Sequence, residues 1–406
     1  MESKKFEITK RAIFTFTSLA ILLFVIIFTI ITFAIKEQQN VSNYSEASRS
    51  FSSQSDESFD NMDSSIIDSI PDISETESEI ITDISDFSTE NISDVEIEHG
   101  WIINEFGYTY VYNGCGYEQF NYKASALKRY VNTLNNFVAL VPETTRMFSI
   151  TVPVSSTFAE IPRDIYVNDN FYNQAQSAFV STVSTLTDER LKHVQIIELL
   201  EESYDRGDYI FYRTDKNWTA DGAYLAYRIF CEYADLQSLP ISSYKRISIE
   251  GFLGSFYTAT KSESMMLTPD EYIYYSPSLD TKTSLTVYDN GLVYNDYSVC
   301  GNKVNSFNCQ NAILGRDAER YEIHTTSQGC SLLIIGDESA YPLIPFLTAN
   351  YKRIDFINPN RFDTPFEDFL KNRNYDDCLL ICYSTNSISG DYIPTLNSLT
   401  GVNSNE

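Results

Sequence analysis

The sequence is poor in the residues that most often build metal sites and proton-transfer sites. It contains only three histidines, two tryptophans and seven cysteines among 406 residues. It has no Cys-x-x-Cys pair and no cysteine/histidine zinc spacing, so we expect no metal and no cofactor. Because the cysteine count is odd and most cysteines lie in apolar or aromatic runs, we expect buried free thiols, with a Cys300–Cys309 disulfide as the alternative.

Basic residues are also scarce. The chain has 29 lysines and arginines against 56 acidic residues, which gives a formal net charge of −27. An acidic surface without a basic stripe repels phosphate backbones, so we expect no nucleic-acid partner. Residues 37–99 alone carry 17 acidic groups and one arginine, among serines and isolated isoleucines. This composition buries too little apolar surface to fold, and it predicts a disordered acidic tether over residues 36–99.

Only one long hydrophobic run occurs. Residues 12–35 are uncharged and strongly apolar, and at about 1.5 Å per residue a helix of this length crosses a hydrocarbon core of roughly 30 Å. A signal peptide is the alternative, but its small-residue cleavage site is absent. Four basic residues precede the run and Lys36 alone closely follows it. We therefore expect a single-pass protein of the cell membrane. By the positive-inside rule, residues 1–11 form a cytoplasmic tail and the globular domain lies outside the cell.

The remainder, residues 100–406, alternates between helical and strand patterns. Helical spacing occurs over 124–140, 170–186, 220–236, 339–349 and 366–371, and strand patterns over 147–154, 193–197, 209–212, 331–335, 353–357 and 378–383. This alternation predicts an α/β domain with a mainly parallel sheet and helices on both faces. Residues 244–321 differ, being rich in Tyr, Thr, Ser, Asn and Gly, and they predict a β-rich insertion or lid.

One motif carries the functional argument. The segment Arg213–Thr219 (RTDKNWT), followed by Gly222–Arg228 (GAYLAYR), resembles the RTDHHWT…GAYxAYR signature of the DHHW protein family. That family is related to SGNH-hydrolase-like esterases and acetyltransferases of cell-envelope polysaccharides, including alginate O-acetylation proteins. Segments 251–257, 352–359 and 378–386 resemble further family motifs. The resemblance implies an SGNH-hydrolase-like fold for most of residues 100–390.

The two signature histidines are replaced by Lys216 and Asn217. In active relatives an aspartate orients the second histidine, which serves as the general base. The resemblance therefore makes Asp215 the orienting carboxylate and puts Asn217 at the position of the base. An amide nitrogen has no usable lone pair and cannot accept a hydroxyl proton, so the expected base is missing.

A second block, Leu332–Ala340 with Pro345–Leu347 following, resembles the family's strand–turn–helix segment that carries the nucleophilic serine. The ungapped match puts Glu338 at the serine position, with Ser339 one residue later. At a helix start this offset rotates a side chain by about 100°, so Ser339 does not simply replace the serine. We expect the remaining histidines, His99, His193 and His324, to be surface or hydrogen-bonded core residues.

These substitutions predict a pseudoenzyme whose cleft binds an envelope polysaccharide or a protein of the same assembly. Besides the degenerate positions, Lys216, Trp218 and Asp337 are candidate ligand-binding residues, although Trp218 also suits a packing role under the sheet edge. One alternative is an active O-acyl esterase or acetyltransferase that uses Ser339. Another is chemistry from converging carboxylates of Asp215, Asp337 and Glu338, either glycoside hydrolysis or cation binding. A structural or interaction protein in which the cleft plays no part is the third.

Overall fold

The structure is a computed structural model that describes residues 97–104, 107–301 and 304–402. All of these belong to one compact unit, Asp94–Glu406. The predicted cytoplasmic tail, the apolar run at 12–35 and almost all of the predicted tether lie outside the described residues. Among the residues that are described, no helix is both long enough and apolar enough to cross a membrane.

An eight-stranded sheet forms the centre of the unit, in the order β5-β4-β13-β11-β12-β10-β8-β9. Its strands are β4 (Arg146–Val152), β5 (Leu191–His193), β8 (Thr283–Asp289), β9 (Leu292–Tyr297), β10 (Arg320–Thr325), β11 (Cys330–Gly336), β12 (Tyr351–Ile357) and β13 (Asp377–Tyr383). The first five strands in the order are parallel, and the last three are joined antiparallel. The sheet is therefore mixed, which corrects the prediction of a mainly parallel sheet.

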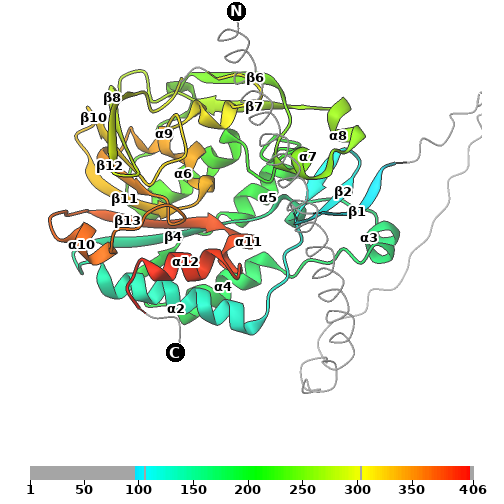
Figure 1. Ribbon diagram of the computed structural model, residues 1–406, viewed down its shortest axis with the longest axis horizontal. Helices are drawn as coiled ribbons and strands as arrows, with labels where there is room; N and C mark the ends of the chain where they lie inside the picture. The colour runs from blue at the N-terminus through cyan, green and yellow to red at the C-terminus, as the bar shows by residue number, and fades with distance from the viewer. Residues whose placement is uncertain (1–96, 105–106, 302–303, 403–406) are drawn as a thin grey trace, which may run out of the picture. The chain divides into compact units, whose positions relative to one another are not determined.

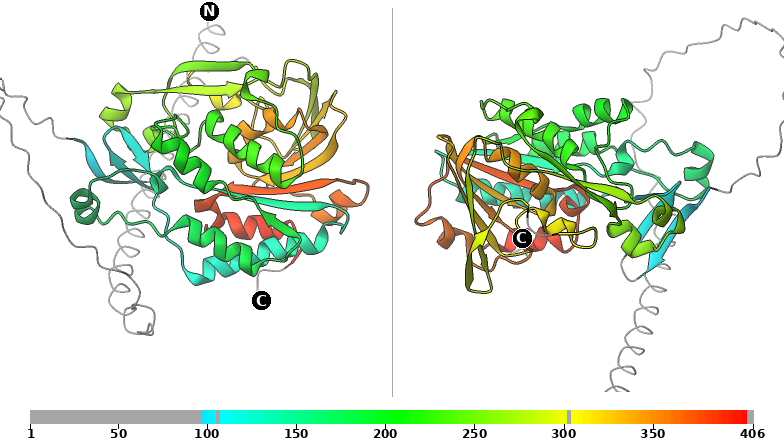
Figure 2. Two further views of the ribbon diagram at one scale, coloured as in Figure 1. Left: turned by 180° about the vertical axis from the view of Figure 1, so that it is seen from behind. Right: turned by 90° about the horizontal axis from the view of Figure 1, so that it is seen from above.

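Helices cover both faces of this sheet, as predicted (Figure 1). On one side lie α2 (Ala124–Leu140), α4 (Gln176–Leu186) and α12 (Tyr392–Ser398), and on the other lie α5 (Ile197–Asp205), α6 (Ala220–Tyr233) and α9 (Ile344–Leu347). The rear view in Figure 2 shows the same two helical layers. Helix α2 has the predicted bounds because Tyr130, Leu134 and Phe137 recur at helical spacing and are buried against the sheet.

Most of the segment predicted as a β-rich insertion or lid continues the main sheet. Its strands β8 and β9, with β10, extend the main sheet, since β10 pairs directly with β12. Leu285 and Val287 alternate with less buried residues along β8, the period-2 pattern of a strand with one buried face. Only β6 (Arg246–Phe252) and β7 (Asp270–Tyr275) form a separate two-stranded ribbon, with α7 (Ser255–Thr260) and α8 (Glu263–Leu267) between them.

A small sheet begins the described chain. Strands β1 (His99–Asn104), β2 (Gly107–Tyr112) and β3 (Cys115–Tyr117) are antiparallel neighbours. Tyr110, Tyr117 and Phe171 form an aromatic cluster beside them, near α3 (Arg163–Asn168). The backbone amide of Gly116 donates to the Arg213 carbonyl at 2.8 Å. The small sheet is thereby joined to the signature segment.

Three local predictions were wrong. The strand expected at 193–197 is β5, which ends at His193, and α5 begins at Ile197. The expected strand at 209–212 is reduced to one bridge between Phe211 and Trp218. The expected helix at 339–349 is a 3-10 helix, Glu338–Leu343, followed by the single turn α9, because Pro342 and Pro345 lack the amide hydrogens of a regular helix. The remaining short elements are 3-10 helices at Ser155–Thr157, Ile241–Ser243 and Cys309–Ala312, with α10 (Phe366–Leu370) and α11 (Ser384–Ser387).

Candidate functional site

The two motif segments meet at the carboxyl edge of the parallel strands. Asp337 directly follows β11, and Ser384 directly follows the neighbouring strand β13. The signature segment 213–219 leads into α6, whose first turn Thr219 caps by accepting a hydrogen bond from the Gly222 amide. Polar groups that follow adjacent parallel strands converge at this edge, which is where open α/β sheets bind ligands.

The β6–β7 ribbon holds the signature segment in place. Asp270, buried at the start of β7, accepts hydrogen bonds from the Thr214 backbone and side chain, both at 2.7 Å. Its other oxygen accepts from the Arg213 guanidinium at 3.1 Å. One strand of the segment predicted as a β-rich insertion or lid therefore holds the motif in place.

Asp215 accepts hydrogen bonds on both of its carboxylate oxygens. Its Oδ1 accepts hydrogen bonds from the Asn217 backbone amide at 2.9 Å and from Asn217 Nδ2 at 2.5 Å. Its Oδ2 accepts from the Ser255 amide at 2.7 Å, at the start of α7. Gly254 makes this approach possible, because a Cβ there would lie 2.2 Å from the Asp215 Cβ. The Asp215 carboxylate therefore points at residue 217, whose side chain is an amide.

Asn217 is fixed from its second side by Tyr383. The Tyr383 hydroxyl, from the end of β13, donates to Asn217 Oδ1 at 2.5 Å. Asn217 thus bridges Asp215 and Tyr383, donating to one and accepting from the other. This arrangement orders the side chain and leaves it no role as a proton acceptor.

Lys216 and Glu338 form an ion pair between the two motifs. Lys216 Nζ lies 2.6 Å from Glu338 Oε1, and the two side chains are 31% and 37% exposed. Partial burial opposes the charge on Lys216, but the carboxylates of Glu338 and Glu118 outweigh it and raise the lysine pKa. Burial likewise disfavours the Glu338 charge, yet the ammonium of Lys216 lowers the glutamate pKa. Both groups are charged near neutral pH.

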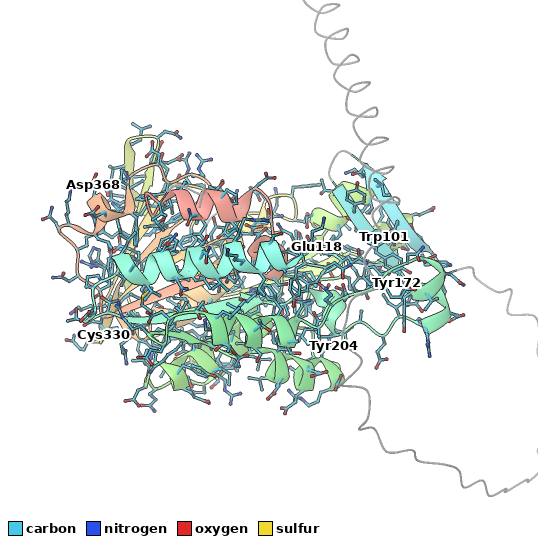
Figure 3. The ribbon with its side chains drawn as sticks, turned by 90° about the horizontal axis from the view of Figure 1, so that it is seen from below. Trp101, Glu118, Tyr172, Tyr204, Cys330 and Asp368 are labelled. Carbon is cyan, nitrogen blue, oxygen red and sulfur yellow. The ribbon has the colours of Figure 1, made fainter. Side chains whose placement is uncertain are left out.

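Glu118 is the site residue that sequence reasoning missed. It follows β3 and lies near the amino-terminal end of α2, on the side of the β1–β2 hairpin (Figure 3). Burial raises its pKa, Lys216 opposes this rise and Glu338 reinforces it. No motif surrounds Glu118 in the sequence, so only the fold, which brings β3 against the signature segment, reveals it.

Asp337 is a buried acceptor and does not face the solvent. It is 2% exposed, its Oδ1 accepts from the Ser339 amide and hydroxyl, and its Oδ2 accepts from the Tyr383 amide and Asn386 Nδ2. Burial, reinforced by the charge of Glu338, raises the pKa of Asp337 to about 6, against the effect of its donors. The prediction that Asp337 contacts a ligand does not fit this burial.

Ser339 and Trp218 are likewise internal. The Ser339 side chain is 0% exposed and its hydroxyl donates to Asp337 Oδ1 at 2.5 Å. Trp218 is 1% exposed, and its Nε1 donates to the Ser339 carbonyl at 3.0 Å. Trp218 therefore has the packing role, and no sugar ring can stack on its face. The hydroxyl of Ser339 is held where no substrate carbonyl reaches it.

The three histidines have partners outside the degenerate site. His193 hydrogen-bonds Ser149 and Thr187, both at 2.6 Å, and burial lowers its pKa to about 4. His99 contacts Asp169, and His324 contacts Glu322, each at 2.8 Å. None of these contacts brings an imidazole to Asn217 or Ser339.

The described carboxylates do not form a metal site. Asp215 and Asp337 direct their oxygens at amide and hydroxyl donors, and Glu338 pairs with Lys216. Within residues 97–402, apart from the two short gaps, no group of three or more His, Cys, Asp or Glu side chains is arranged to hold an ion. All seven cysteines are free, so Cys300 and Cys309 are not bridged.

A cleft of about 530 Å³ opens beside these residues. The degenerate motif contributes Asp215 and Lys216 to it, and Glu118 lies on the same wall. The other walls come from β2, α7 and the segment after residue 303, with Tyr108, Ser255, Phe256, Thr258 and Gln310 among the lining residues. An exposed tyrosine, neutral hydrogen-bonding groups and a charged cluster thus surround one hollow, which we name the motif cleft.

Together, the fold and the site define an α/β protein whose two motif segments meet at the carboxyl edge of the parallel strands, with Asp215, Asn217 and Glu338 at this meeting point. The chain belongs to the DHHW protein family, whose sequence model matches residues 43–357. A search among curated proteins finds no match.

Solved structures support the fold. A DHHW family protein from Eubacterium siraeum DSM 15702 is 23% identical, with a TM-score of 0.63 over 73% of this chain and 97% of that one. Bacillus cereus PatB1, solved with a sulfonyl adduct, is 14% identical, with a TM-score of 0.56 over 73% of this chain and 98% of that one. At these identities the likeness establishes a shared α/β architecture.

Proposed function

We propose that this chain is a DHHW protein that has lost acyl-transfer catalysis and uses the motif cleft to bind an envelope polysaccharide or a protein of the same assembly. The observation that carries the proposal is the 2.6 Å ion pair of Lys216 and Glu338. It joins the residue beside the missing base to the residue at the nucleophile's position. A charged pair therefore stands where the chemistry needs a hydroxyl next to a proton acceptor.

None of the replacing groups supplies that chemistry. Lys216 has a raised pKa and stays protonated near neutral pH, so it cannot serve as the base. Asn217 accepts from Tyr383 and donates to Asp215, and its amide has no basic nitrogen. The negative charge of Glu338 is balanced by its ion pair with Lys216. The alternative of an active esterase that uses Ser339 is not favoured, because that hydroxyl is buried and donates to Asp337.

The lining of the motif cleft supports a carbohydrate ligand. Tyr108 is 55% exposed and offers an aromatic face, while Thr258, Ser255 and Gln310 offer hydrogen-bonding groups. Ligand sites typically combine apolar or aromatic walls with a few placed polar groups, and a sugar ring has both kinds of surface.

We further propose that residues 12–35 anchor the chain in the cell membrane with the domain outside, an inference from the apolar run and its flanking charges. Fusion of a reporter enzyme after residue 99 tests the orientation. Activity of the reporter outside the cytoplasm is expected, and activity in the cytoplasm alone would reject it.

Binding and turnover can be tested in one sample. The full chain is incubated with an O-acetylated hexaose of N-acetylglucosamine, binding is measured by calorimetry and acetyl release by mass spectrometry. We expect binding without acetyl release. Tyr108→Ala should weaken binding about tenfold, a loss of about 1.4 kcal/mol, whereas Tyr172→Ala, which changes an exposed tyrosine outside the cleft lining, should not. Sustained acetyl release would overturn the loss of catalysis, and equal affinities of the two variants would overturn the location.

A further inference from the structure

A second groove lies on the other side of the β3–signature contact. Two hollows of about 300 Å³ and 710 Å³ share four lining residues, Cys115, Tyr117, Tyr204 and Gly207, and so form one continuous groove. It has no lining residue in common with the motif cleft. We name it the tyrosine groove, after the five tyrosines on its walls: Tyr112, Tyr117, Tyr204, Tyr209 and Tyr212.

The rings of the tyrosine groove are held in place from behind. Tyr204, on α5, packs against the buried Phe158 with ring centroids 5.8 Å apart. Tyr209 and Tyr212 meet edge to face at 6.0 Å, and the Tyr212 hydroxyl donates to the Ile273 carbonyl. Rigid aromatic surfaces bind with little loss of side-chain entropy, which favours a preformed site.

Two of the hydroxyls remain available for a ligand. Within the described residues, neither the Tyr112 nor the Tyr204 hydroxyl has a hydrogen-bond partner, and both side chains are only half-buried. Figure 3 labels Tyr204 beside α5, on the same side of the domain as the β1–β2 hairpin. A half-buried ring with a free hydroxyl offers both a stacking face and a polar contact.

The free charges of the groove are negative. Arg213 is paired with Asp270 at 3.1 Å, and Arg246 with Glu271 at 3.2 Å, so neither guanidinium is left for an anionic ligand. Glu160 and Asp205 are exposed and carry no ion pair within the described residues. The groove therefore presents unpaired hydrogen-bond acceptors, which suit hydroxyl or amino donors and repel carboxylates and phosphates.

We propose that the tyrosine groove is a second carbohydrate subsite, which takes a glycan made of uncharged or amino sugars. Sugar rings stack on Tyr112 and Tyr204, and their hydroxyl or amino groups donate to Glu160 and Asp205. The proposal rests on the proposed function only in taking a glycan as the ligand. It adds a separate binding location and a selectivity for ligand charge, because the unpaired carboxylates of the groove repel a polyanionic glycan.

The test uses the full chain and three probes: hexaoses of N-acetylglucosamine, of glucosamine and of galacturonate. Calorimetry should detect binding of the first two and none of the galacturonate hexaose. Tyr204→Ala should weaken binding about tenfold, while Tyr204→Phe, which keeps the ring, should lose less. Asp205→Asn should weaken the glucosamine hexaose more than the N-acetylated one. Tyr172→Ala is the matched control and should leave all affinities unchanged.

Each failure points to a different conclusion. If Tyr204→Ala and Tyr172→Ala, both with wild-type melting temperatures, bind equally well, the tyrosine groove is not a subsite. If Tyr204→Ala does not fold, the exposed-residue variants Asp205→Asn and Glu160→Gln decide, and unchanged affinity in both overturns the proposal. Binding lost only in Tyr108→Ala would keep the motif cleft and reject the groove. Tighter binding of the galacturonate hexaose, or no binding of either other hexaose, would also overturn it.

Discussion

The ammonium of Lys216 lies 2.6 Å from the carboxylate of Glu338 and so connects the two motif segments. In sequence these residues are far apart, and the fold brings their two segments together at the carboxyl edge of the parallel strands. Asp215, which should orient the base, instead holds Asn217, and Tyr383 closes the other side of that amide. The Asn217 side chain is therefore held on both sides by hydrogen bonds.

A double-mutant cycle should measure this ion pair. Lys216→Met and Glu338→Gln, singly and together, should give a coupling free energy of about 1 kcal/mol in urea unfolding, because the pair is a third exposed and solvent screens it. The pair Lys371–Asp368, whose side chains are 63% and 53% exposed, is the control and should couple more weakly. A coupling near zero for Lys216 and Glu338 would show that the two motifs are not linked through these charges.

Gly254 should tolerate no side chain. In Gly254→Ala the new Cβ would lie 2.2 Å from the Asp215 Cβ, so the motif or α7 must shift, at a cost of about 1–3 kcal/mol of unfolding free energy. Gly390→Ala is the matched control, since nothing lies within 4 Å of its Cβ position and its backbone is unstrained. Equal melting temperatures of the two variants would contradict the close packing of Asp215 against α7.

Asp337 should be needed for folding, although it does not contact a ligand. Asp337→Asn keeps the shape of the side chain but replaces one acceptor oxygen by an NH₂ donor. That donor then faces other donors, either those of Ser339 or those of Tyr383 and Asn386. We expect a loss of about 2–4 kcal/mol by denaturant unfolding. Asp391→Asn, at an exposed residue, should change stability by less than about 0.5 kcal/mol. A neutral result for Asp337→Asn would mean that the buried carboxylate is not needed.

His193 should produce a stability loss in acid. Burial lowers its folded pKa to about 4, whereas the unfolded value is about 6.5. Between these pH values only the unfolded chain binds the proton, so stability falls as pH drops from about 6.5 to 4, by about 3 kcal/mol for this group. His193→Gln removes this titrating group. The difference in unfolding free energy between the wild type and the variant should therefore decrease by about 3 kcal/mol as the pH falls from about 6.5 to 4. An advantage that is constant across this range would contradict the neutral, buried imidazole.

Much of the architecture could be predicted because local patterns encode it. The period of Tyr130, Leu134 and Phe137 fixes α2, and the apolar runs of β11 and β13 mark buried parallel strands. The orientation of β8, β9 and β10 could not be predicted, because short Tyr- and Thr-rich strands suit either a separate lid or an antiparallel sheet edge. Strand pairing depends on contacts between distant residues, which no local pattern records.

The candidate site was predictable only in part. The signature motif identified residues 215–218 and the second block identified residues 337–339, but sequence spacing does not reveal burial. Asp337 was therefore predicted to contact a ligand, and Trp218 either to contact a ligand or to pack under the sheet edge, whereas both are internal. Glu118 was missed for the converse reason: its importance comes from the packing of β3 against the signature segment.

Hydrolysis of p-nitrophenyl acetate by the full chain tests the central claim most directly. The proposed loss of catalysis predicts that the wild type releases nitrophenol no faster than Ser339→Ala, since the Ser339 hydroxyl is fully buried and a substrate carbonyl cannot reach it. Steady turnover by the wild type that Ser339→Ala abolishes would contradict the account, and would make this chain an enzyme.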